Sequence, residues 1–185
     1  IVAMIAEGAK TLNAEQIGKI VAAFSAVWAV LDVGTIMNLL EKGYQNVLTA
    51  AANTMINISF ALISNFGLLS KENQAKAWGL IEGSFNKLIG LDSVFADADK
   101  IVGMLKARGG DFLSAAANGL GKMTIALIDN FAAFFEAGYG DKAMKMIQDS
   151  FRAITGMLTP DNVAKILCHF DGAVFLAAVL RNLAA

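Results

Sequence analysis

Proline, histidine and cysteine are nearly missing from this sequence, which contains one of each in 185 residues. Because Cys168 is the single cysteine, the chain cannot close an intrachain disulfide. The single histidine, His169, has neither the further ligands that a structural metal site requires nor a nucleophile motif around it. A glycine-rich phosphate loop of the required form is also missing. We therefore predict that the protein is not an enzyme.

Charged side chains are scarce as well, and their signs are balanced. They make up 17% of the residues, against about 25% in ordinary soluble domains, and the net charge is −1. Nucleic-acid binding needs a basic face that the sequence does not supply, so a nucleic-acid partner is not expected. Hydrophobic residues are abundant, at 56% with a mean hydropathy of +0.56. This surplus must be buried in a core, an oligomer interface, a ligand cavity or a bilayer.

The arrangement of the apolar residues is typical of helices. Long segments are rich in Ala, Leu, Ile and Met, and no strand-length segment alternates convincingly between apolar and polar side chains. Thr159 followed by Pro160 is the clearest helix start, Ser70 is expected to start another helix, and Gly67 is expected to end the helix before it. We predict an all-α multi-helix bundle of eight or nine helices, in a single domain over residues 1–185.

An internal repeat is visible in the middle of the chain. Leu48–Phe66 and Leu113–Phe131 align without gaps at an offset of 65, and ten of their nineteen positions are identical. The similarity extends on both sides, which predicts two copies of one multi-helix unit. Terminal helices would close the two ends, as capping units do in repeat proteins. The predicted units cover about 32–91 and 97–157, and the predicted terminal helices cover about 12–31 and 158–183.

A charge-free run from Gly43 to Ser70 raises the question of a membrane span. A spanning helix needs about 20 mostly apolar residues. The first copy carries many Asn, Ser and Thr side chains, and the second copy places Lys122 and Asp129 in the equivalent helix. Charges and polar groups at such positions oppose insertion. A permanent span is therefore not expected, while membrane association remains open.

Two asparagines at equivalent positions are the first candidate site residues. Asn53 and Asn118 each follow a Leu-x-Ala-Ala-Ala run in the middle of a predicted helix. They are either polar anchors of two related ligand pockets or buried packing residues that find hydrogen-bond partners. Asn65 and Asn130 precede an identical Phe near predicted helix ends, where Asn satisfies free backbone groups.

Aromatic side chains form the second set of candidates. Phe131, Phe134 and Phe135 cluster in one segment, and Phe60 lies in the first repeat helix. Such clusters fill cores, and they also line pockets for lipids, sterols or pigments. We predict that these four residues contact an apolar ligand together with Asn53 and Asn118.

Three non-catalytic functions follow from the apolar surplus. The first is binding of an apolar small molecule, such as a lipid or pigment, in a core cavity. The second is a structural or scaffolding role in a larger protein assembly, with the surplus buried at subunit interfaces. The third is a membrane-active, pore-forming type of protein that is soluble before it inserts. The sequence does not identify a cofactor beyond a possible lipid or pigment.

Overall fold

The structure is a computed structural model, and it describes residues 19, 20, 22, 33–90, 98–169 and 171–184. Within these residues all regular structure is helical, which confirms the predicted all-α class. The bounds are α3 (Val33–Glu41), α4 (Gln45–Ser64), the 3₁₀-helix η1 (Phe66–Leu68), α5 (Lys71–Gly90), α7 (Ala98–Lys106), α8 (Gly110–Asp129), α9 (Phe131–Glu136), α10 (Gly140–Gly156), α11 (Pro160–Leu167) and α12 (Gly172–Ala184). The predicted helix at about 12–31 lies almost entirely outside the described residues.

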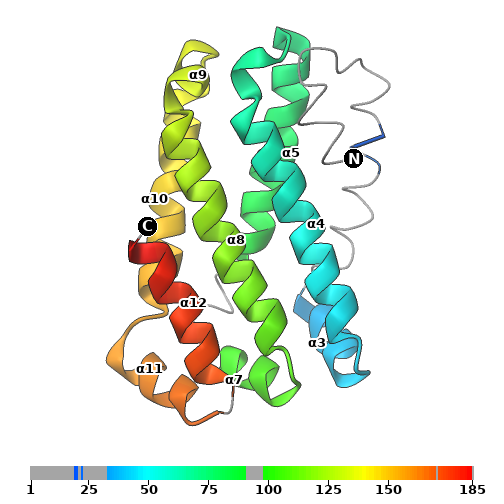
Figure 1. Cartoon of the computed structure of the whole chain (residues 1–185), viewed down its shortest axis with the longest axis vertical. Coiled ribbons are helices and arrows are strands. Elements are labelled where there is room, and N and C mark those ends of the chain that lie inside the picture. The colour runs from blue at the N-terminus through cyan, green and yellow to red at the C-terminus, as the bar shows by residue number, and fades with distance from the viewer. Residues whose placement is uncertain (1–18, 21, 23–32, 91–97, 170, 185) are drawn as a thin grey trace.

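The helices form two layers. In Figure 1, α4, α8 and α12 lie side by side in that order and run in the same direction. Helices α5 and α10 lie behind them and return in the opposite direction. The short helices α3, α7 and α11 lie together at the lower end of the view. The closest packing is between α4 and α8, which are far apart in the sequence but adjacent in space.

The core lies between the two layers and is filled by large apolar side chains. Among the described residues, five phenylalanines are fully buried: Phe66, Phe85, Phe112, Phe134 and Phe175. Helix α8 supplies core side chains along most of its length, because it has neighbours on three sides in α4, α10 and α12. This central position explains why α8 is apolar on most of its circumference.

Helix starts agree with the sequence prediction. Thr159 accepts a hydrogen bond from the backbone N–H of Asn162 at 3.4 Å, and Pro160 is the first residue of α11. Ser70 Oγ accepts from the N–H of Asn73 at 3.4 Å at the start of α5. These caps depend only on residues within one turn of the chain, so they could be read locally.

The prediction that Gly67 ends the long helix is wrong. Helix α4 ends at Ser64, and Gly67 lies inside η1. The helix end is instead capped by Asn65, whose Nδ2 donates to the carbonyl oxygen of Ala61 at 2.9 Å. Asn130 makes the same bond to Ala126 at 2.9 Å at the end of α8, so both asparagines have the predicted helix-end role. The carbonyl is satisfied by a side chain, so a left-handed glycine is not required there.

Helix α4 is the described helix that is long and apolar enough to cross a membrane. Half of its most apolar window is buried inside the fold. Such a helix is equally typical of a protein core, and membrane association therefore remains a prediction.

Candidate functional site

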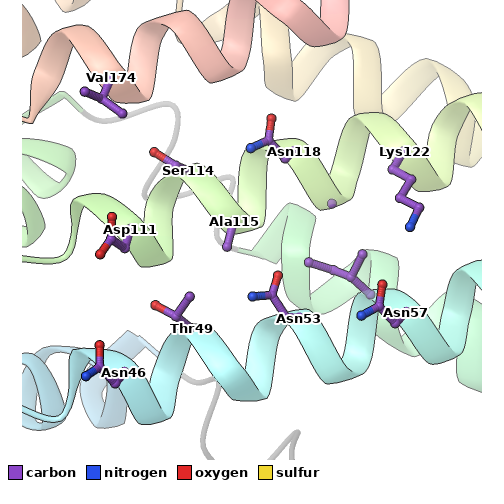
Figure 2. A pocket seen from close by; sticks show the side chains of 12 residues that line it. Asn46, Thr49, Asn53, Asn57, Asp111, Ser114, Ala115, Asn118, Lys122 and Val174 are labelled. Atoms are coloured by element: carbon purple, nitrogen blue, oxygen red, sulfur yellow. The ribbon is translucent and has the colours of Figure 1, made fainter. Parts of the chain in front are cut away.

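A groove with a volume of about 480 Å³ runs between α4 and α8. Its size is within the range of ligand-binding clefts, about 300–1,000 Å³. Figure 2 shows the two helices running in the same direction along the groove, with polar side chains on both. The lining residues are Asn46, Thr49, Asn53, Ile56 and Asn57 from α4, Asp111, Ser114, Ala115, Asn118, Gly119 and Lys122 from α8, and Val174 from α12.

The polar residues of the groove form pairs at one sequence offset. Each polar residue of α4 has a partner 65 positions later on α8, and in Figure 2 the partners lie at the same level along the groove. The pairs are Asn46 with Asp111, Thr49 with Ser114, Asn53 with Asn118, and Asn57 with Lys122. The two helices therefore present equivalent faces to one shared groove.

The carboxamides of the groove are free to bind a ligand. Asn46, Asn53, Asn57 and Asn118 are exposed. Within the part of the chain that the structure describes, their side chains form no hydrogen bond. Asn53 and Asn118 therefore do not have the buried packing role that was one of their two interpretations. The structure places both in a single groove rather than in two separate pockets.

The hydroxyl group of Ser114 is the least satisfied polar group of the groove. Its Oγ is buried and has no hydrogen-bond partner among the described residues. Its equivalent, Thr49, is satisfied, because Thr49 Oγ1 donates to the carbonyl oxygen of Gln45 at 3.0 Å. A buried polar atom without a partner costs about 1–3 kcal/mol.

The floor of the groove depends on Gly119. A Cβ atom at this position would lie 2.1 Å from Cδ1 and 2.4 Å from Cγ1 of Ile56. Glycine therefore allows the buried Ile56 side chain of α4 to pack directly against the backbone of α8. This close approach brings the two rows of polar side chains within reach of one ligand.

The two ends of the groove carry opposite charges. Asp111 lies in the first turn of α8, where the helix dipole favours a negative charge. Lys122 lies eleven positions further along α8, and its Nζ is 4.2 Å from the centre of the Phe60 ring. Figure 2 shows the Lys122 side chain extending from α8 toward α4. The ring of Phe60 holds this ammonium group at the end of the groove by a cation–π contact.

The other predicted aromatic residues do not line the groove. Phe134 is fully buried, and its ring stacks on Phe66 with a centroid distance of 4.2 Å. Phe131 is half-buried against the core, and Phe135 is 70% exposed. The structure thus gives these three phenylalanines three different environments. It brings Asn53 and Asn118 to the groove, places Phe60 against Lys122 without making it a lining residue, and places the others elsewhere.

Sequence reasoning missed six polar residues of the groove: Asn46, Thr49, Asn57, Asp111, Ser114 and Lys122. A signal for them existed, because each lies four or seven positions from Asn53 or Asn118 and so shares its helix face. The repeat offset of 65 would then have paired the polar residues of α4 with those of α8. The sequence did not reveal that this face is left uncovered.

The groove offers hydrogen bonding and charge rather than reactive chemistry. Among the described residues, no group of three His, Cys, Asp or Glu side chains is placed to hold a metal ion. The pKa of the Glu72 carboxyl group is lowered, because Lys76 Nζ donates a hydrogen bond to it at 2.7 Å and adds a positive charge. That pair is an exposed ion pair on α5, away from the groove.

Comparison with known proteins found no matching family model, no matching curated protein and no matching solved structure. The fold and the groove therefore define the protein only as an all-helical protein with an open, polar groove between two parallel helices.

Proposed function

We propose that the protein is a non-catalytic binding module that holds an extended polypeptide segment in the groove between α4 and α8. The observation that carries this proposal is the set of unpaired carboxamides along the groove, from Asn46, Asn53, Asn57 and Asn118. A carboxamide has both donors and an acceptor, so it can bond the N–H and C=O groups of a peptide backbone in any sequence context.

The spacing of the carboxamides supports an extended chain. Asn53 and Asn57 are four positions apart on a helix, which corresponds to about 6 Å along its axis. In an extended chain, peptide groups that face the same side recur every two residues, or about 6.6 Å. Two successive carboxamides of α4 can therefore meet two successive peptide groups of such a segment, while Asn118 of α8 offers a further carboxamide at the level of Asn53.

We further propose that the groove arises from repetition of one unit. Helices α3 and α7 both have nine residues, α4 and α8 both have twenty, and both pairs start 65 positions apart. Gly43 and Arg108 are also 65 positions apart, and both adopt positive φ, at 81° and 59°. Two copies of a unit in parallel place equivalent side chains at the same level along neighbouring helices. In this arrangement α11 and α12 close the second copy.

The earlier prediction of a lipid or pigment in a core cavity stays a prediction. The described pockets are open at the surface, and polar side chains line the largest of them. Phe131, Phe134 and Phe135 do not line it. A polar, extended ligand therefore accounts for the described groove better than an apolar molecule does, because an apolar molecule would leave the carboxamides without partners.

The test is selection of peptides on the full chain, followed by substitution of the two matched asparagines. Dodecapeptides displayed on phage are selected, and a synthetic fluorescein-labelled copy of the best one is titrated by anisotropy. We expect Asn53→Ala with Asn118→Ala to weaken binding about tenfold or more, the loss of one to two hydrogen bonds. Thermal stability should not fall, because both residues are exposed and alanine favours helices.

The matched control is Asn86→Ala, which removes an exposed asparagine from α5, outside the groove. It should leave peptide affinity unchanged. An equal loss of affinity in the control would contradict the proposal, as would a failure to select any peptide. A loss of thermal stability with unchanged affinity would assign the two asparagines to packing.

A second candidate function, a subunit of a larger assembly, is favoured by an apolar stripe along α10. Met144 and Phe151 are 42% and 43% exposed on one face of α10, and Phe135 packs against Gly140 at the start of this face.

If a second copy covers the stripe, native mass spectrometry should give a multiple of 19.5 kDa. Phe135→Ser with Phe151→Ser should reduce this to one chain. A wild-type mass of one chain at micromolar concentration would exclude self-assembly, and a co-purified lipid in the same spectrum would support the apolar carrier.

A further inference from the structure

We infer that the groove selects a segment with one basic and one acidic side chain about six residues apart, bound with the basic side chain at Asp111 and the acidic one at Lys122. This inference rests on the proposed function and adds the charge pattern and length of the ligand. It is carried by the placement of two opposite, unneutralised charges at the two ends of one groove.

Neither charge is neutralised by the protein. Asp111 and Lys122 are exposed, and within the described residues neither forms an ion pair. By contrast, Asp99 in the first turn of α7 and Lys165 in the last turn of α11 pair with each other at 2.9 Å. The equivalents of Asp111 and Lys122 on α4 are the neutral Asn46 and Asn57. Each end of the groove therefore has one net charge and one carboxamide that can bond the same ligand group.

The position of Lys122 is fixed by its neighbour. Its Nζ lies 4.2 Å from the centre of the Phe60 ring, on the α4 side of the groove. A lysine side chain in open solvent would lose more rotamer freedom on binding a carboxylate. The contact with Phe60 already restricts the Lys122 side chain in the free protein. Less rotamer freedom is then lost on binding, which makes Lys122 a better anchor.

The length of the ligand follows from the helix. Eleven positions of α8 separate Asp111 from Lys122, which corresponds to about 16 Å along the axis. An extended chain covers about 3.3 Å per residue. Five residues of extended chain cover this distance. Because successive side chains alternate between the two faces of an extended chain, the next spacing that puts both charged side chains on the same face is six residues. The carboxamides of Asn53 and Asn118 lie between the two ends, where only backbone groups of the ligand need to be recognised.

The experiment compares capped peptides on the full chain and on two charge variants. The probes are acetylated and amidated heptapeptides with a Ser/Ala interior and with ends Lys/Glu, Lys/Lys or Glu/Glu, each carrying a fluorophore outside the charged positions. On the wild-type chain we expect the Lys/Glu peptide to bind at least about fivefold more tightly than the other two. Asp111→Lys should shift the preference to Glu/Glu, and Lys122→Glu should shift it to Lys/Lys, each by about tenfold.

Two outcomes separate this inference from the proposed function. If selected peptides bind and lose affinity in the Asn53→Ala, Asn118→Ala chain, but the charge variants do not alter the preference among the three probes, the charge pattern is refuted and the peptide groove stands. If no peptide binds at all, both fail.

Phe60→Leu provides a further readout. It should weaken binding of the Lys/Glu peptide severalfold and leave the Lys/Lys peptide unaffected, because only an acidic ligand group uses Lys122.

Discussion

Replacing Phe134 with alanine should lower the free energy of unfolding by about 3–5 kcal/mol, the largest single effect that the structure predicts. The Phe134 side chain is fully buried. Its ring stacks on Phe66 at 4.2 Å and meets the edge of Trp78 at 5.8 Å between ring centres. Removing it deletes these contacts and leaves a cavity in a core that α9 cannot fill, because α9 has only six residues and sits between fixed neighbours.

The next residue in the chain is the matched control. Phe135 is 70% exposed, so Phe135→Ala should change the free energy of unfolding by no more than about 0.5 kcal/mol. Urea denaturation followed by circular dichroism measures both variants under the same conditions. Equal losses for the two substitutions would contradict the assignment of Phe134 to the core and Phe135 to the surface.

Replacing Gly119 with alanine should destabilise the protein by about 1–3 kcal/mol although alanine is the better helix former. The new Cβ would lie 2.1 Å from Cδ1 of Ile56, so α4 and α8 must separate or Ile56 must leave its position. Either movement disturbs the floor of the groove. We therefore expect peptide affinity to fall together with the free energy of unfolding, measured by anisotropy and by urea denaturation.

The origin of this effect can be tested by a double-mutant cycle. Ile56→Ala alone should cost about 2–5 kcal/mol, because Ile56 is a buried side chain. In the Gly119→Ala background it should cost at least about 1 kcal/mol less, because the alanine at 119 fills the space that Ile56 vacates. Additive losses would show that Gly119 does not act through Ile56.

Gly79 is a suitable control, because an added Cβ there would meet nothing within 4 Å, and Gly79→Ala should be neutral or stabilising.

Local signals of the sequence predicted most of the fold that could be compared. The start of α11 at Thr159 and Pro160 and the helix-end role of Asn65 and Asn130 involve groups within four residues of each other. The helical segment before Gly138 is divided into α8 and α9 at Asn130, because the Asn130 side chain caps α8 there. The ending at Gly67 was predicted wrongly for the same reason at Asn65, since a side-chain cap and a left-handed glycine are alternative ways to satisfy one carbonyl group.

The site was predictable only in part. Asn53 and Asn118 stood out because identical runs precede them, and the structure brings them to one groove. Their partners along the groove share the same helix faces, but periodicity alone cannot say whether a polar face is covered by another helix or left open. The charges of Asp111 and Lys122 can be assigned to the two ends of one groove only because α4 packs beside α8.

The sequence by itself determined the helical class, the absence of an intrachain disulfide and the local caps, because these depend on composition or on contacts within one helical turn. Tertiary structure decided which side of each helix is buried. Adjacent helical residues point about 100° apart, so Phe134 can enter the core while Phe135 faces solvent. It also decided that α4 and α8 lie in parallel, with equivalent residues at the same level. That packing requires residue 119 to be a glycine, because the Ile56 side chain occupies the space that a Cβ atom would need. The two residues are 63 positions apart in the sequence, and no local pattern specifies their contact.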